Sequence, residues 1–271
     1  MLEMLSTMFS YQFMARALIV GVLVSLCAAL LGVSLVLKRY SMIGDGLSHV
    51  GFGALAVAAA LGAAPMAVTI PVVVLAAFLL LRLSSTGRLK GDAAIAMIST
   101  GALAVGVIVL SLSTGMTSDV NNYLFGSMLA MSEGDVTLSL ILGAAVLTLF
   151  VLFYRRIFSV TFDETFARAT GGHAEACNML LALLTAVTIV LGMRVMGTML
   201  ISSLIIFPAL TAMRVCRSFK SVTLCAAAVS VVCFFMGLCA SYLLSTAAGA
   251  TVVVANILAF LAFAAVGRLR G

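Results

Sequence analysis

The apolar run FMARALIVGVLVSLCAALLGVSLVL, residues 13–37, decides the fold class because Arg16 is its only charged residue. A hydrocarbon core of about 30 Å is crossed by about 20 helical residues, so the run is long enough to span a membrane. It is too long for the core of a signal peptide, and it ends at Lys38 and Arg39 instead of a small-residue cleavage site. The run therefore predicts a membrane helix that stays in the protein.

The rest of the chain repeats this pattern. Of its 271 residues, 64% are hydrophobic and 9% are charged, and the mean hydropathy is +1.29, far above that of soluble domains. Apolar runs of about 18 to 25 residues predict helices rather than the alternating strands of a barrel. We expect an all-α polytopic membrane protein, a single transmembrane domain over residues 1–271, with eight or nine spans. The expected spans are residues 13–37, 43–63, 66–82, 93–112, 136–154, 174–193, 196–213, 222–246 and 250–267.

Basic residues gather in alternate connections between these spans. The positive-inside rule places such connections, and with them the C-terminus, in the cytoplasm. They include Lys38 and Arg39, the connecting loop 155–172, and Arg268 near the C-terminus. One outward connection contains NNYLFGSMLAM, residues 121–131, which is too short to span and predicts a re-entrant or interfacial helix.

Several function classes are excluded by what the sequence lacks. The net charge of +6 comes from residues at the ends of apolar segments, which read as topology signals and as contacts with membrane lipid, so we expect no nucleic acid partner. Lysine occurs only at positions 38, 90 and 220, none of them in a phosphate-binding loop. We therefore expect no ATP hydrolysis and no catalytic residues in this chain. The six cysteines lack paired spacing and predict buried free thiols.

Asp45 and His49 are the candidate metal-binding residues. Residues four apart share one face of a helix, so the carboxylate and the imidazole can meet one ion. Counting from Arg39, His49 lies roughly 15 Å along the chain direction, near the membrane centre, where an ionisable group is costly without a partner or a wet cavity. Oxygen and nitrogen donors suit zinc, manganese or iron. The alternative is structural, with Asp45 capping the helix start and His49 bonded to a carbonyl oxygen.

Several blocks in one order carry a family resemblance. They are LKRYSMIGDGLSH, DAAIAMISTGALAVGV, YLFGSML, FDETFARATG, MRVMGTMLISSLIIFPALTA and AAGATVVV. Over nearly its whole length the chain resembles the permease subunits of bacterial zinc, manganese and iron uptake ABC transporters. The stretch SHVGFGALA, residues 48–56, which contains His49, looks closer to the zinc-type branch.

The resemblance implies a half-permease in the bacterial plasma membrane that pairs with a second copy, giving a homodimer. It implies separate cytoplasmic subunits that bind and hydrolyse ATP, an external metal-binding protein, and no permanently bound cofactor, the metal being the transported substrate. Asp45 and His49 map onto the metal path, and Pro208 maps onto a helix kink that shapes the cavity. The ATPase-coupling helix maps onto Phe162, Asp163, Glu164, Phe166, Ala167, Arg168 and Gly171.

Two other readings of the residues remain open at this point. A secondary transporter would use Asp45 and His49 as a proton relay and would need no ATPase. A membrane scaffold without transport would leave the intramembrane pair without a purpose.

Overall fold

The computed structural model describes residues 12–85, 91–113 and 133–270, and all the regular structure within them is helical. The helices are α2 (Gln12–Leu37), α3 (Ile43–Ala60), α4 (Pro65–Ser85), α5 (Gly91–Leu112), α7 (Glu133–Leu152), α8 (Tyr154–Phe162), α9 (Glu164–Ala169), α10 (Ala174–Met196), α11 (Thr198–Met213), α12 (Phe219–Leu244) and α13 (Ala248–Arg270). The all-α polytopic prediction is confirmed. The short helix expected at residues 121–131 lies outside the described residues.

In the described part of the chain, 8 helices are long and apolar enough to cross a membrane. The shorter apolar helix α11 follows α10 after a break at Gly197, whose φ of 87° is in the region that favours glycine. α10 thus extends to Met196, beyond the span end expected at residue 193. The residues expected to form a loop after residue 154 begin instead with the short helix α8.

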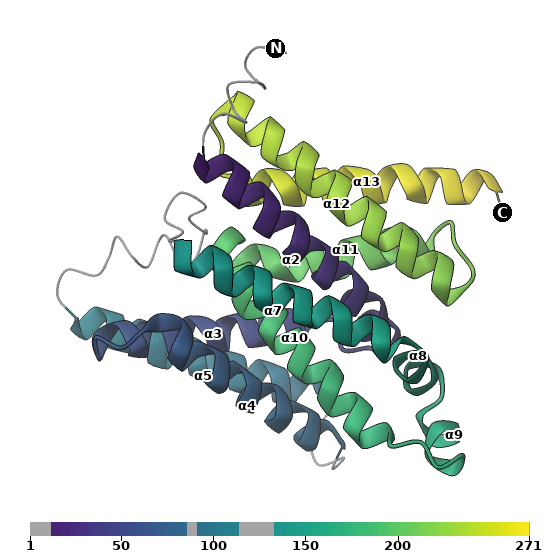
Figure 1. The fold of residues 1–271 in the computed structure, drawn as a ribbon, viewed down its shortest axis with the longest axis horizontal. Coiled ribbons are helices and arrows are strands. Elements are labelled where there is room, and N and C mark those ends of the chain that lie inside the picture. The colour runs from purple at the N-terminus through teal and green to yellow at the C-terminus, as the bar shows by residue number, and fades with distance from the viewer. Residues whose placement is uncertain (1–11, 86–90, 114–132, 271) are drawn as a thin grey trace.

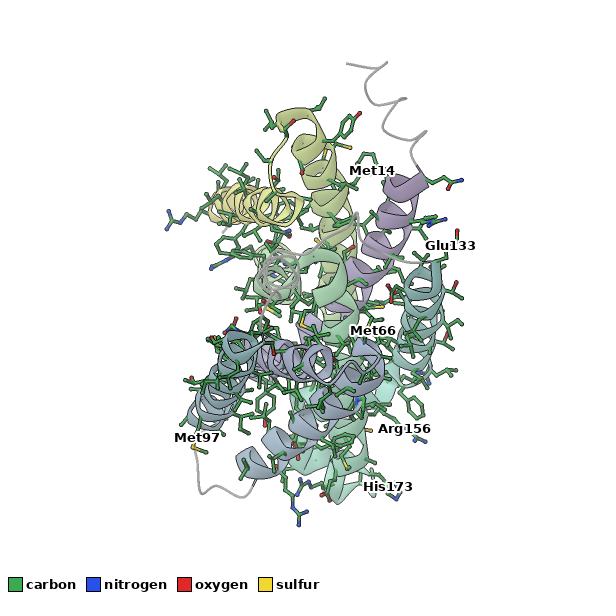
Figure 2. All side chains as sticks on the ribbon, turned by 90° about the vertical axis from the view of Figure 1, so that its left-hand side faces the viewer. Met14, Met66, Met97, Glu133, Arg156 and His173 are labelled. Atoms are coloured by element: carbon green, nitrogen blue, oxygen red, sulfur yellow. The ribbon has the colours of Figure 1, made fainter. Side chains whose placement is uncertain are left out.

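The helices pack in two groups around a central set. Figure 1 shows α3, α4 and α5 together on one side, α11, α12 and α13 on the other, and α2, α7 and α10 between them. Over their spans α2 and α10 are each 67% buried and α3 is 72% buried, whereas α5 and α7 are each 22% buried and α13 is 17% buried. Met97 of α5, for example, projects away from the bundle (Figure 2). The weakly buried helices therefore offer apolar faces to lipid or to another subunit.

Close helix contacts depend on glycine. A Cβ on Gly32 of α2 would lie 2.0 Å from the backbone oxygen of Ile205 on α11, so no side chain fits there without separating the two helices. Small residues at such points let helix backbones approach each other in a membrane.

We expect Gly32→Ala to destabilise the protein by about 1–3 kcal/mol, because overpacking at a backbone contact cannot be relieved by a rotamer change. Gly101→Ala on α5 is the matched control, since its Cβ would meet no atom within 4 Å, and we expect it to be neutral or stabilising by up to about 1 kcal/mol. Thermal unfolding of the detergent-solubilised variants measures both. Equal Tm values for the two variants would contradict the close contact between α2 and α11.

Candidate functional site

Asp45 and His49 lie on one face of α3, near its start. Asp45 is in the first turn, where the helix dipole favours a carboxylate, and the N-cap position is Met42. Asp45 therefore does not cap the helix, as the structural alternative required. Its Oδ2 lies 3.6 Å from Nε2 of His49, and the Asp45 and His49 side chains are 42% and 22% exposed. The expected pairing of the two side chains is thus present in the structure.

Glycines hold α3 close to its neighbours on both sides of this pair. A Cβ on Gly53 would lie 2.5 Å from the backbone oxygen of Ala102 on α5, and one on Gly51 would lie 2.8 Å from Met193 on α10. Gly44, beside Asp45, faces Ile205 and Ser202 of α11. The helix that carries the pair is therefore clamped between α5 on one side and α10 and α11 on the other.

The position of the pair along its helix differs from the count made from the sequence. That estimate counted a helical rise from Arg39, but α3 begins at Ile43 and the residues before it form a turn. His49 consequently lies about 9 Å from the helix start, at 1.5 Å per residue. Asp45 is therefore close to the helix end that the basic residues flank, whereas His49 lies about 4 Å short of the middle of the helix.

Some polar atoms near the pair lack partners. Among the described residues, the buried Nδ1 of His49 and the buried Oγ of Ser202 make no hydrogen bond. An unpaired buried polar atom costs roughly 1–3 kcal/mol, which a bound ion or water would offset. His49 is therefore not the satisfied core histidine of the structural alternative. No group of three or more His, Cys, Asp or Glu side chains that could hold a metal occurs in the part of the chain described here.

A short helix, α9, forms within the stretch predicted to be a coupling helix, at the end of the bundle where α7 ends and α10 begins (Figure 1). Asp163 is its N-cap and accepts a hydrogen bond from the backbone N–H of Phe166 at 2.8 Å. Arg168 in the last turn donates to Glu164 at 2.6 Å. Gly171, with φ of 79°, follows the helix and lets the chain turn back into α10. Phe162 belongs to the preceding helix α8.

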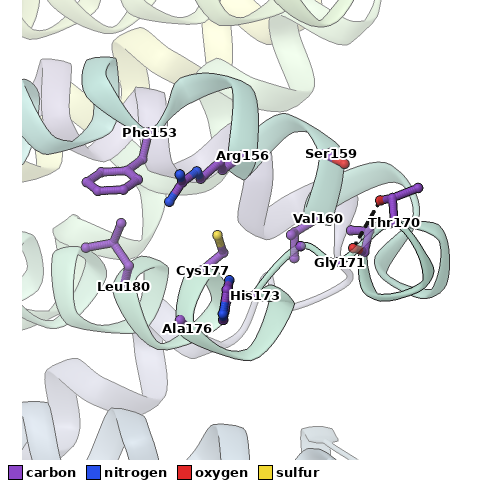
Figure 3. Close-up of a pocket in the computed structure, with 12 residues that line it drawn as sticks. Phe153, Arg156, Ser159, Val160, Thr170, Gly171, His173, Ala176, Cys177 and Leu180 are labelled. Carbon is purple, nitrogen blue, oxygen red and sulfur yellow. Dashed lines mark hydrogen bonds between the residues drawn. The ribbon is translucent and has the colours of Figure 1, made fainter.

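α8 and α9, called the coupling segment after the role predicted from the sequence, rest on the bundle through one face and leave aromatic rings partly exposed. Ala167 is buried in a small apolar cluster with Val160, Ala174 and Cys177. Phe162 and Phe166 are 59% and 61% exposed. A pocket of about 590 Å³ opens beside α9, lined by Phe153 and Arg156 on one side and by Leu180 and Cys177 on the other (Figure 3).

Rings join the coupling segment to α12. The ring centroids of Phe158 and Phe162 lie 5.1 Å and 5.8 Å from that of Phe219, in the first turn of α12. Offset and edge contacts of this kind add to the stabilisation that burial supplies. The segment is thus attached to the transmembrane bundle at a point far from Asp45 and His49 in the sequence.

Pro208, the predicted kink, lies inside α11, which continues to Met213. Proline has no backbone N–H, so the carbonyl of Leu204 loses its usual helix partner at this point. The kink itself stays a prediction.

Lys38 is a residue whose role the sequence reading missed. Its charge was interpreted as a topology signal, but its side chain is only 9% exposed, and Nζ lies 3.4 Å from Oε2 of Glu164. Nζ also donates a hydrogen bond to Oδ1 of Asn178 on α10. The only signal in the sequence was the scarcity of lysine. The spacing of three lysines along the chain does not show which of them is buried.

The pKa values of Lys38 and Glu164 are both lowered, and each group influences the other. Burial lowers the pKa of the Lys38 ammonium group, and the neighbouring Glu164 carboxylate opposes that shift. Burial would raise the pKa of Glu164, but its hydrogen bond with Asn178 and the charge of Lys38 outweigh burial and lower it. The stabilisation from the Glu164 carboxylate is complete above its ordinary pKa and is lost as the pH falls through the lowered value. The Glu164 carboxylate therefore stays ionised throughout the neutral range, because its pKa is lowered.

The geometry defines a polytopic helical membrane protein with an acid and imidazole pair in one helix and a capped helix outside the bundle. Residues 10–267 match the ABC 3 transport family. The chain is 30% identical over 255 residues to the manganese transport system membrane protein MntC of Halalkalibacterium halodurans, covering 94% of this chain and 87% of that protein. It is 30% identical over 250 residues to the high-affinity zinc uptake system membrane protein ZnuB of Haemophilus influenzae, covering 92% and 96%.

A solved structure shares the fold. PsaBC from Streptococcus pneumoniae in complex with Fab superimposes with a TM-score of 0.86 at 29% identity, covering 96% of this chain and 94% of the matched chain. The chain belongs to the ABC 3 transport family, so the resemblance seen in the sequence blocks is confirmed. It is a membrane permease subunit and not an enzyme, as predicted. The relatives named for manganese and for zinc do not single out one metal.

Proposed function

We propose that this permease subunit carries zinc into the cytoplasm along a path that passes Asp45 and His49, driven by ATP hydrolysis in a separate subunit. The observation that carries the proposal is the separation of 3.6 Å between Asp45 Oδ2 and His49 Nε2 on one helix face. Two ligands of a tetrahedral zinc ion, each about 2.1 Å from it, lie about 3.4 Å apart. One zinc ion therefore fits between the two atoms with little movement of either side chain.

The donor set also supports zinc over manganese. An imidazole nitrogen with a carboxylate oxygen binds zinc more tightly than manganese in the usual order of divalent affinities, and manganese favours sites built from oxygen. Two ligands from one chain hold an ion weakly, and weak binding is what a transport path needs, because the ion must leave again. Manganese and iron remain the competing substrates, and the test below includes manganese.

A second copy of the chain is proposed to complete the path. Asp45 and His49 are both partly exposed, and the described residues offer no third donor beside them. If this face of α3 lies in a two-fold symmetric interface, it meets its own copy, which brings the donors to two carboxylates and two imidazoles. The apolar faces left open on α5 and α13 leave room for such an interface and for lipid.

The proposed partners occupy opposite sides of the membrane. The coupling segment lies on the side where basic residues gather, among them Arg155, Arg214 and Arg268, which the positive-inside rule assigns to the cytoplasm together with the C-terminus. The ATP-binding subunits dock there. An external metal-binding protein delivers the ion at the opposite ends of the helices, where Arg16 of α2 and Glu133 of α7 form an ion pair of 2.5 Å.

Uptake of radioactive zinc into proteoliposomes tests the proposal. The vesicles hold this chain with its ATP-binding subunit, and the metal-binding protein is added outside, with or without ATP inside. We expect zinc uptake that requires ATP and that a tenfold excess of manganese reduces only slightly. Stronger competition by manganese would reassign the metal. Uptake that ignores ATP and follows a proton gradient would replace the proposal with the secondary transporter that Asp45 and His49 could also serve.

A further inference from the structure

Lys38 joins three elements that are distant in the sequence. It follows α2 directly, and its ammonium group contacts Glu164 in the first turn of α9 and Asn178 near the start of α10. With 9% of its side chain exposed, it is far less accessible than Lys220, which lies exposed in the first turn of α12. A lysine that served only as a topology signal would keep its charge in water.

The chain between Lys38 and α3 is a short turn held by backbone hydrogen bonds, called the closed turn below. The backbone N–H of Arg39 donates to Val36 and that of Tyr40 to Leu35, which is the paired pattern that ends many helices. Arg39 takes the left-handed position, with φ of 62°, where glycine is usual. The N–H of Ile43 donates to the carbonyl of Tyr40, so the turn runs straight into α3. Asp45 follows in the first turn of that helix.

We propose that Lys38 is a positioning residue that transmits movement of the coupling helix α9 to the Asp45 and His49 pair. The inference deepens the proposed function and rests on it. A displacement of Glu164 displaces the end of α2 through the ion pair, and the closed turn passes it to the start of α3. A pocket of about 870 Å³, lined in part by Glu164, Arg168 and Asn178, gives α9 room to move beside this contact.

The position of the aromatic contacts makes the proposal testable. Phe158 and Phe162 hold the coupling segment to Phe219 of α12 independently of Lys38. Loss of the Lys38 charge therefore removes the ion pair between α9 and the end of α2, while the segment keeps its attachment to α12. A residue that merely held the fold together would show the opposite result, loss of the assembled complex.

The test compares Lys38→Met with wild type in the complete transporter in proteoliposomes. Methionine keeps the unbranched apolar stem and removes the ammonium group. We expect the complex to assemble and to hydrolyse ATP, and the amount of zinc imported per ATP hydrolysed to fall at least about fivefold. Lys38→Arg keeps the charge and should restore most of that ratio. Lys220→Met, which removes an exposed lysine at the same end of the bundle, should leave the ratio unchanged.

Other results would overturn the inference. An unchanged ratio in Lys38→Met, or a complex that no longer assembles, would assign Lys38 a merely structural role. If Lys38→Met proves too unstable to purify, Glu164→Gln with Lys38 intact serves instead, because it removes the same ion pair from the other side and should lower the same ratio. Absence of ATP-dependent uptake in wild type would count against the proposed function and not against Lys38 alone.

Discussion

His49→Ala should abolish most ATP-dependent zinc uptake while the transporter still assembles. The variant removes the imidazole whose Nε2 lies 3.6 Å from Oδ2 of Asp45. Asp45 is then the single candidate ligand left on this copy of α3. Loss of even an outer group around a metal typically costs 10–100-fold in affinity or activity, so we expect uptake to fall at least about tenfold. Initial rates of uptake into proteoliposomes, normalised to the amount of assembled complex, measure the effect.

The sequence offers a matched control for this variant. His173 is the other histidine of the chain, and it stands exposed at the start of α10, where its side chain makes no capping hydrogen bond. We expect His173→Ala to retain wild-type uptake. Uptake by His49→Ala equal to that of His173→Ala would leave the permease assignment intact and remove Asp45 and His49 from the metal path.

Phe166→Asp should detach the ATP-binding subunit from the permease. Phe166 lies on α9 with 61% of its surface exposed, outside the apolar cluster that buries Ala167. An exposed aromatic ring on a short helix beyond the membrane spans is the kind of anchor that fills a pocket in a partner protein, and removing one commonly costs about 2 kcal/mol or more. Since about 1.4 kcal/mol corresponds to tenfold in affinity, we expect the dissociation constant to rise more than tenfold.

The control for this experiment keeps an apolar side chain at the same position. Phe166→Leu should bind the ATP-binding subunit with less than about threefold loss, because leucine fills part of the same pocket without adding a charge. Co-purification of the detergent-solubilised complex, followed by a titration with the ATP-binding subunit, gives the dissociation constants of both variants. Wild-type affinity in Phe166→Asp would show that α9 does not carry the docking contact.

The features that could be predicted without coordinates are those set by residues close together in the sequence. Long apolar runs and the basic residues at their ends predict the membrane-spanning helices of the described residues and their count within one, because a helix satisfies all of its backbone hydrogen bonds within one segment. The capping pattern around Asp163, Arg168 and Gly171 is local, so it also could be predicted from the sequence. The four-residue spacing of Asp45 and His49 set them on one face for the same reason.

Contacts between segments that are far apart in the sequence could not be predicted from local patterns. The distance of His49 from the start of its helix depended on a turn at Arg39, a non-glycine residue in the left-handed region, so a straight helical count from Arg39 overestimated that distance. The role of Lys38 depended on α9, more than a hundred residues further along the chain, folding back against the end of α2.

The sequence by itself therefore determined the class of protein, the helical spans and the local geometry of both candidate sites. The tertiary structure alone decided which groups are buried together: Lys38 with Glu164, Phe219 with the coupling segment, and Gly32 against the backbone of Ile205. The physical reason is that helix formation and membrane insertion follow from neighbours along the chain. The exposure of a charge, a ring or a glycine follows from whichever helix happens to pack against it.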